Sequence, residues 1–336
     1  MGIIYEIVGS CCKKRYNFGY NYTYIFGLKN LGNTCFMNSS LQCIFNSNKL
    51  IKKLENIHIK KNPKLRLANE ISLMLKDIKK GQTFIDPKNI KDILGEVEEK
   101  YKYFEQNDAN EFITIFLNVL LKELNGIGEY KTENIPKDEL EKKAFNKLED
   151  KFFNKNKSFL LNLFYGRLKR QYICENGHIC AIKFNNFNTL ILPHPEDSND
   201  IVDLLKVYQK NKSIDDTIFC NTCQSEKKYS IKTLIYNIPD YFILCIEKET
   251  IYSYSGLKYP KILETKDFTN NSSKYSLNSF IIYIGDRERG HYTAKCEKNN
   301  NWYHFSDANY KIIEENNIHD KNAIILFYEK ISVENS

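Results

Sequence analysis

Apolar residues recur at helical spacing through the first third of the chain. From residue 35 to about residue 125, apolar side chains return every three or four positions, the period of a helix with one buried face. The pattern predicts helices over residues 37–45, 67–78 and 108–124. Residues 138–153 show the same period with more charged positions, and we expect an exposed helix there.

The pattern changes to short apolar runs after about residue 165. These runs are rich in Ile, Leu, Phe and Tyr, and turn-forming or charged residues bound them, as is typical of strands. The clearest runs cover residues 172–174, 189–192, 241–246, 279–283 and 323–328. Helices followed by strands indicate the α+β class, in which the two kinds of element are segregated along the chain.

Composition narrows the class of protein. With 336 residues, of which 42% are hydrophobic and 13% aromatic, the chain can bury a large core and is too apolar to be disordered. The net charge is +7, but basic residues are interleaved with acidic ones, so we expect no nucleic-acid partner. No apolar stretch reaches the length of a transmembrane segment, and the first residues do not resemble a secretion signal.

Cysteine usage bears on the cellular compartment. The ten cysteines are scattered and lack the density of a small disulfide-stapled domain. This usage favours a reducing compartment, and we expect the protein to be cytoplasmic, with the nucleus as the alternative.

One cysteine and one distant histidine stand out chemically. The helix predicted just after Cys35 places this residue at a helix N-terminus, where free N–H groups and the helix dipole lower a thiol pKa. Gly32 and Asn33 suit a tight turn and a helix cap, which would aim the thiol at solvent. His291 can take the thiol proton, and the amide of Asn30 can stabilise an oxyanion. Spacing alone leaves open a buried structural cysteine and an unrelated surface histidine.

Five motifs in order carry a family resemblance. Residues 27–42, GLKNLGNTCFMNSSLQ, resemble the cysteine box of the ubiquitin-specific proteases, a family of papain-like cysteine deubiquitinases. GHYTA at 290–294, continuing to WYHFSD at 302–307, resembles the histidine box of that family. The remaining matches are QNDANEF at 106–112, which is similar to the family's Gln-Gln-Asp-Ala-x-Glu-Phe, LFYG at 163–166 and AIILFY at 323–328.

The resemblance implies a papain-like fold with a helical thumb, a β-rich palm and β fingers. It covers residues 25–330, with the fingers at about 165–240 and an N-terminal extension at 1–24. It also implies hydrolysis of the bond after the C-terminal glycine of ubiquitin, through an acyl-enzyme on Cys35 with His291 as the base. The implied partners are ubiquitin or ubiquitin conjugates, and catalysis needs no cofactor.

The third catalytic position departs from the family pattern. The family places Asp or Asn directly after the Phe of the tryptophan segment, where it accepts the imidazole N–H. Here Ser306 follows Phe305, and Asp307 comes next. The position directly after Phe305 favours Ser306 as the acceptor of the His291 N–H, whereas the negative charge favours Asp307. If Asp307 is not that acceptor, it can support the oxyanion region instead. Adjacent strand residues point to opposite faces, so we expect only one of them to contact His291.

Three further residues acquire roles from the resemblance. Asn30 lies five positions before Cys35, as the family's oxyanion residue does. Asp108 and Glu111 occupy the acidic positions that face the basic tail of the substrate, where they can form charge-assisted hydrogen bonds. The alternative for Glu111 is a solvated position at the start of a helix.

A second cysteine cluster lies in the predicted fingers. Cys220 and Cys223 form a Cys-x-x-Cys pair, which together with a distant second pair is a signature of structural zinc. The family places Cys-x-x-Cys-Gly-His earlier in the chain, but the matching segment, which begins at Cys174, reads CENGHIC and lacks one cysteine. Either His178 or Cys180 can supply the fourth ligand. The alternative is a degraded knuckle that binds no metal. A zinc ion at this place would be structural and would take no part in hydrolysis.

Two other functions stay open. Residues 247–250, Glu-Lys-Glu-Thr, stand where the family usually shows a basic residue followed by Arg-Phe. This segment lies next to the region that we expect to contact ubiquitin. The protein could therefore be a protease for a ubiquitin-like modifier instead. Together with Ser306, the segment also allows a weakly active or inactive ubiquitin-binding module.

Overall fold

The computed structural model describes residues 25–56, 64–132, 134–193, 199–247, 257–269, 272–286 and 289–331. Two features of the sequence fall outside these residues: the expected N-terminal extension at 1–24 and positions 248–250 of the segment that departs from the family pattern. None of the described helices is both long enough and apolar enough to cross a membrane.

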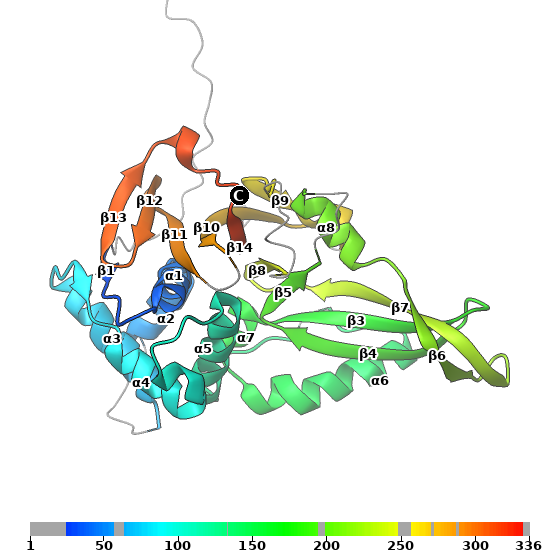
Figure 1. Cartoon of the computed structure of the whole chain (residues 1–336). Helices are drawn as coiled ribbons and strands as arrows, with labels where there is room; N and C mark the ends of the chain where they lie inside the picture. Colours follow the sequence, from blue (N-terminus) through cyan, green and yellow to red (C-terminus); the bar gives the residue numbers. More distant parts are fainter. Residues whose placement is uncertain are drawn as a thin grey trace, which may run out of the picture.

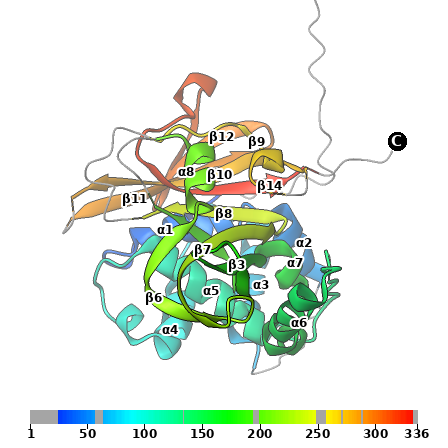
Figure 2. The same ribbon diagram turned by 90° about the vertical axis from the view of Figure 1, so that its right-hand side faces the viewer.

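The first half of the described chain forms the thumb, a group of helices that lies below the large sheet in Figure 2. Its central helix is α1 (Cys35–Ile44), and all ten of its residues are buried. Because α1 has no solvent face, its polar side chains bond internally, as when Gln42 donates to the carbonyl oxygen of Phe26 at 2.7 Å. The other thumb helices are α2 (Asn48–Asn56), α3 (Arg66–Lys79), α4 (Lys88–Val97), α5 (Ala109–Glu123), α6 (Glu139–Leu148) and α7 (Phe159–Phe164).

The palm is a mostly antiparallel sheet on which α1 packs. Its strands follow the order β13-β12-β11-β10-β14-β8-β5, and β9 pairs with β10. At β8 the sheet is buried on both faces: Ile243 and Cys245 join the thumb core, whereas Leu244 joins a second core with Leu204 of α8 (Ile201–Tyr208). The strands are β5 (Thr189–Leu192), β8 (Tyr241–Ile246), β9 (Ile262–Glu264), β10 (Lys274–Gly285), β11 (Gly290–Lys298), β12 (Asn301–Ser306), β13 (Asn309–Ile313) and β14 (Ala323–Lys330).

The fingers are a four-stranded antiparallel sheet that extends away from the palm (Figure 1). The strand order is β4-β3-β7-β6, with bounds β3 (Gly166–Cys174), β4 (Ile179–Phe187), β6 (Lys212–Cys220) and β7 (Ser225–Asn237). Between β4 and β6 the chain returns to the palm to form β5 and α8. A short parallel pair, β1 (Gly27–Leu28) with β2 (Phe84–Ile85), completes the described sheets.

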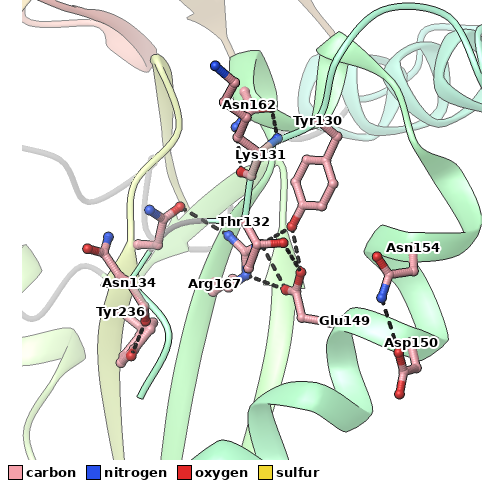
Figure 3. Close-up of polar contacts among 11 residues, drawn as sticks. Tyr130, Lys131, Thr132, Asn134, Glu149, Asp150, Asn154, Asn162, Arg167 and Tyr236 are labelled. Carbon is pink, nitrogen blue, oxygen red and sulfur yellow. Dashed lines mark hydrogen bonds and ion pairs between the residues drawn. The ribbon is translucent and has the colours of Figure 1, made fainter. Parts of the chain in front are cut away.

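A buried ion pair joins the thumb to the base of the fingers (Figure 3). Arg167 of β3 donates from Nε to Oε1 of Glu149 at 2.8 Å, and the two side chains are 3% and 6% exposed. Tyr130 donates to Oε2 of Glu149 at 2.6 Å, and the guanidinium lies 3.9 Å from the centre of the Phe153 ring. Both charges are therefore paired and covered, and removal of either partner would leave the other buried without its opposite charge.

The predicted α+β class is confirmed, with helices first and strands after them. The segment at 138–153 is helical and mostly exposed, as predicted, but some of its residues are buried. There α6 continues into a π-helical turn at Glu149–Phe153, and Phe145 and Phe153 are 1% and 0% exposed. Their rings pack at the junction of thumb and fingers, a long-range contact that outweighs the charged local pattern.

Candidate active site

Cys35 is the first residue of α1, where the thumb meets the palm. The loop before it is shaped by Asn30, whose Oδ1 accepts hydrogen bonds from the backbone N–H of Gly32 at 2.9 Å and of Thr34 at 3.3 Å. Gly32 has a φ of +103°, which glycine adopts without strain. The loop thus turns tightly and leaves Cys35 only 4% exposed.

Two expectations about this loop are wrong. The helix cap is Thr34, while Asn33 adopts a φ of +52° and donates from Nδ2 to the carbonyl oxygen of Phe104 at 2.8 Å. The thiol of Cys35 does not face solvent, because β11 packs against α1 and its backbone reaches the sulfur at Tyr292. The cysteine therefore lies in a narrow site between two elements rather than on an open helix end.

The surroundings of the Cys35 thiol decide its ionisation. Burial is the largest effect and raises the pKa, and the nearby Asp307 carboxylate raises it further. Backbone hydrogen bonds from Tyr292 and Phe36 lower the pKa, as does Gln106, whose Nε2 lies 3.9 Å from Sγ. The net shift is upward. The pKa lowering expected at a helix N-terminus is therefore outweighed by the loss of water around the sulfur.

His291 lies on β11 and is held from the neighbouring strand β12. Its Nε2 is 2.9 Å from Oγ of Ser306. The next residue, Tyr292, hydrogen bonds to Cys35 through its backbone, so the histidine and the thiol belong to one site. When Nε2 carries a proton and donates it to Ser306, the lone pair of Nδ1 is available to accept the thiol proton.

Asp307 faces the cysteine loop rather than the histidine. Its Oδ2 accepts a hydrogen bond from Nδ2 of Asn30 at 2.8 Å, and its Oδ1 accepts one from Nδ2 of Asn38 at 2.7 Å. The residue adopts a φ of +51° between β12 and β13, so its backbone leaves the extended conformation of the strand. The structure thus places Ser306, and not Asp307, against His291.

Two amide side chains at the site had no role assigned from the sequence. Asn38 is 1% exposed and follows Cys35 by three residues, which puts both on the same face of α1. Gln106 precedes α5, and its Nε2 donates to the carbonyl oxygen of Gly290 at 2.5 Å as well as approaching Cys35. Asn38 could have been identified from the sequence, because it is a polar residue in the first turn of a helix whose other positions are mostly apolar or small. A buried side-chain amide needs a hydrogen-bond partner, which points to a role in the site.

A cavity of about 250 Å³ adjoins the site, with Tyr292, Asp108 and Glu247 among its lining residues. Asp108 also caps α5, since its Oδ1 accepts a hydrogen bond from the backbone of Glu111 at 3.0 Å. Glu111 itself does not line this cavity and forms an ion pair with Lys100. The structure therefore brings one of the two predicted acidic residues to the cavity and leaves the other outside it.

Four predicted metal ligands come together at the tip of the fingers: Cys174, His178, Cys220 and Cys223, which we call the metal cluster. Their donor atoms all lie within 4.8 Å of one another. Nδ1 of His178 is 3.7, 3.8 and 3.3 Å from the sulfurs of Cys174, Cys220 and Cys223, respectively. Tetrahedral zinc, with Zn–S bonds of about 2.3 Å and Zn–N bonds of about 2.0 Å, separates sulfur from nitrogen by about 3.6 Å. The donor set therefore fits zinc, with His178 in the position that Cys180 could have taken.

Comparisons with known proteins agree with this geometry. Residues 26–328 match the family model described as ubiquitin carboxyl-terminal hydrolase. The chain is 25% identical over 342 residues to ubiquitin carboxyl-terminal hydrolase 2 of Homo sapiens, a match that covers 91% of this chain and 55% of that protein. It is 24% identical over 372 residues to ubiquitin carboxyl-terminal hydrolase 4 of Saccharomyces cerevisiae, covering 93% of this chain and 40% of that protein. The chain thus spans about half the length of these relatives.

Solved structures show the same fold. The chain superposes with a TM-score of 0.72 and 18% identity on a chain of the SAGA DUB module with Ubp8 bound to monoubiquitin, covering 96% of this chain and 73% of that one. Against the same module bound to ubiquitin aldehyde, the TM-score is 0.71 at 17% identity, covering 94% and 71%. The predicted fold and family resemblance are both confirmed. Since the family model spans nearly all of the described residues, this chain belongs to the ubiquitin carboxyl-terminal hydrolase family.

Proposed function

We propose that this protein is a thiol-dependent deubiquitinase, which hydrolyses the bond after the C-terminal glycine of ubiquitin. One arrangement carries the proposal: Cys35 begins α1, and His291 stands on the adjacent strand with its imidazole 2.9 Å from Ser306. The relatives are named ubiquitin carboxyl-terminal hydrolases, and two similar structures hold monoubiquitin or ubiquitin aldehyde. These names support ubiquitin as the partner of this chain.

The reaction begins with proton transfer from the thiol to His291. Burial raises the pKa of Cys35 and so favours the protonated thiol in the free enzyme, and the base takes the proton as the substrate is attacked. The thiolate adds to the carbonyl carbon of the terminal glycine, and the imidazolium protonates the leaving amine. A water molecule, activated by His291, then hydrolyses the thioester and frees Cys35.

Asn30 stabilises the oxyanion with an N–H that Asp307 does not use. A side-chain amide has two N–H donors, and Asp307 accepts one of them at 2.8 Å. The second remains for the negatively charged oxygen of the tetrahedral intermediate. In this proposal Asp307 is a positioning residue that acts through Asn30. Gln106 is a further donor candidate, because its Nε2 lies 3.9 Å from the Cys35 sulfur.

The cavity beside Tyr292 is the proposed binding site for the tail of the substrate. Asp108 lines it and can hold a basic residue of the tail through a charge-assisted hydrogen bond. Glu111 forms an ion pair with Lys100. It could bind a basic residue of the same tail only if that residue replaced Lys100.

We further propose that the metal cluster binds one structural zinc ion. The ion would tie the end of β3 to the end of β6, and it would supply no chemistry to hydrolysis. All eight cysteines among the described residues are free, which supports a reducing compartment, and the cytoplasm, with the nucleus as the alternative, remains our proposal for the location.

Two observations favour alternatives. A neutral hydroxyl at Ser306 stabilises imidazolium less than a carboxylate would, which favours a slow enzyme that mainly binds ubiquitin. Glu247 lines the cavity where the family usually shows a basic residue, which favours a ubiquitin-like modifier with a different tail.

A ubiquitin probe with an electrophile at its C-terminus tests the main proposal. We expect covalent labelling of the wild-type protein and of the control variant Cys43→Ala, which removes the other cysteine of α1 and lies outside the cavity lining. Cys35→Ala should not be labelled, although it should stay folded and still bind ubiquitin. Matched probes built on ubiquitin-like modifiers separate the alternatives. Labelling of Cys35→Ala, or labelling by another modifier only, would overturn the proposal.

A further inference from the structure

A second cavity, of about 550 Å³, lies at the junction of the thumb with the palm and the base of the fingers. Its lining comes from α2, from residues 129–131, from α7 and the start of β3, and from residues 237–240 and 330. It shares no lining residue with the cavity beside Tyr292. Small-molecule sites have volumes of roughly 300–1,000 Å³, so this cavity is large enough for such a ligand.

Part of the wall of this second cavity is made of buried side chains. Phe159, Leu161 and Tyr165 line it and are all buried. Arg167 lines it too, and its ion pair with Glu149 holds it in place (Figure 3). The cavity therefore reaches down to the packed core and is not merely a gap between mobile surface side chains.

Hydrogen bonds connect the segments around the cavity. Nδ2 of Asn162 in α7 donates to the carbonyl oxygen of Lys131 at 3.1 Å, and the two residues lie side by side in Figure 3. The carbonyl oxygen of Asn162 accepts from the backbone N–H of Asp240 at 3.0 Å, and that of Asp240 accepts from Lys330 at 2.8 Å. Nζ of Lys49 in α2 lies 2.8 Å from Oδ2 of Asp240. The lining is thus held in position before any ligand binds.

The charge of the lining is strongly positive. Only Glu129 and Asp240 are acidic, and they pair with Lys131 and Lys49 at 3.8 and 2.8 Å. Glu149 neutralises the arginine from outside the lining, so three positive charges remain in excess. The six basic lining residues are Lys49, Lys52, Lys53, Lys131, Arg167 and Lys330.

Two of these lysines have no partner of opposite charge. Lys53 and Lys330 lie within ion-pair distance of no carboxylate in the described part of the chain. Lys49, Lys52 and Lys53 also stand three and four positions apart on one face of α2, a spacing at which like charges repel each other and disfavour a helix. A bound anion would turn this repulsion into attraction.

We propose that this cavity, which we call the basic cavity, binds a small molecule that carries several phosphate groups. Lysine ammonium groups are common phosphate ligands, and here they approach the cavity from α2, from residue 131 and from the end of β14. A ligand with phosphates on several sides can meet all three directions at once. This site is independent of the proposed hydrolysis, because none of its residues belongs to the proposed active site.

The test is calorimetric titration of the full chain with myo-inositol hexakisphosphate. We expect one molecule bound per chain, with an affinity that falls as the salt concentration rises, because salt screens the attraction. Uncharged myo-inositol should not bind. Benzenehexacarboxylate, which carries six carboxylates instead of phosphates, should bind several-fold more weakly.

Charge-reversal variants locate the site. Lys53→Glu and Lys330→Glu should each weaken binding of the hexakisphosphate about tenfold or more, because each loses a charge-assisted hydrogen bond. Lys53→Gln, a milder change, should weaken it less. The matched control Lys210→Glu reverses an exposed lysine outside the lining and should bind as the wild type does. All variants keep the metal cluster, so any chelation of zinc by the probe is the same in each.

The proposal is overturned if the hexakisphosphate does not bind, or if Lys53→Gln, Lys53→Glu and Lys330→Glu all bind it as tightly as Lys210→Glu. Equal binding of benzenehexacarboxylate would overturn the assignment to phosphate. The ubiquitin probe separates this site from the proposed function: Lys53→Glu and Lys330→Glu should still be labelled at Cys35.

Discussion

Replacement of Ser306 would show which residue orients the imidazole of His291, the proposed base. Ser306→Ala removes the hydroxyl 2.9 Å from Nε2 of His291. A neutral hydrogen bond contributes about 0.5–1.5 kcal/mol, which corresponds to a kcat/KM lower by about 2- to 13-fold. Ser306→Asp offers a charge-assisted bond of about twice that strength, so we expect activity to be kept or raised. Asp307→Ala should also lower activity, because it releases Asn30 and Asn38.

The assay is hydrolysis of a fluorogenic substrate attached to the ubiquitin C-terminus, with kcat and KM measured separately and melting curves as a control for folding. If Asp307 acts through Asn30, the double variant Asp307→Ala/Asn30→Ala should be little worse than Asn30→Ala alone. A purely structural role for Asp307 would lower the melting temperature without this coupling. The reasoning fails if Ser306→Ala is silent while Asp307→Ala is as inactive as His291→Ala.

Three further outcomes follow from the structure. The rate at which iodoacetamide alkylates Cys35 should rise with pH with a midpoint above the pKa of an ordinary cysteine, because burial raises the pKa of this thiol. Asp307→Asn should move that midpoint down, because it removes the nearby negative charge. An ordinary midpoint in both proteins would contradict this reasoning. Arg167→Leu should cost about 3–5 kcal/mol of unfolding free energy in a urea titration, and the double change with Glu149→Leu should restore much of it. Elemental analysis should find about one zinc per chain, and a chelator or Cys223→Ala should lower the melting temperature. A protein without metal whose melting temperature is the same in chelator would favour a knuckle that binds no metal.

Local patterns were sufficient for most of the fold. The period of apolar residues located α1, α3 and α5, because each helix buries one stripe or more against a neighbour. The same reasoning predicted the mostly exposed helix at 138–153, where charged residues outnumber apolar ones, but it did not identify the buried positions there. The buried rings of Phe145 and Phe153 find their partners only in tertiary structure, including the guanidinium of Arg167.

The choice between His178 and Cys180 could not be made from composition or spacing, because both side chains can bind zinc. The backbone decides it. Gly177 adopts a φ of +84°, which permits a tight turn, and the carbonyl of His178 then accepts a hydrogen bond from the backbone of Cys174 at 3.0 Å. This turn carries the imidazole to the metal cluster. Cys180 follows on β4 and is left outside the metal cluster.

The ionisation of Cys35 was misjudged for a related reason. A helix N-terminus favours a thiolate only while water or donors also reach the sulfur, and here β11, more than two hundred residues later in the chain, covers it. The pKa therefore depends on a long-range contact that no local pattern contains.

Ser306 and Asp307 contact different parts of the site. Ser306 contacts His291, whereas Asp307 contacts Asn30 and Asn38. Asp307 already raises the pKa of Cys35, and its carboxylate accepts hydrogen bonds from the amides of Asn30 and Asn38. A second carboxylate at position 306 would stabilise imidazolium but would add to the charge that disfavours the thiolate. Ser306→Asp should therefore move the alkylation midpoint of Cys35 to higher pH even where kcat/KM is kept or raised. A neutral hydroxyl avoids that second effect, at the expense of weaker support for the imidazolium.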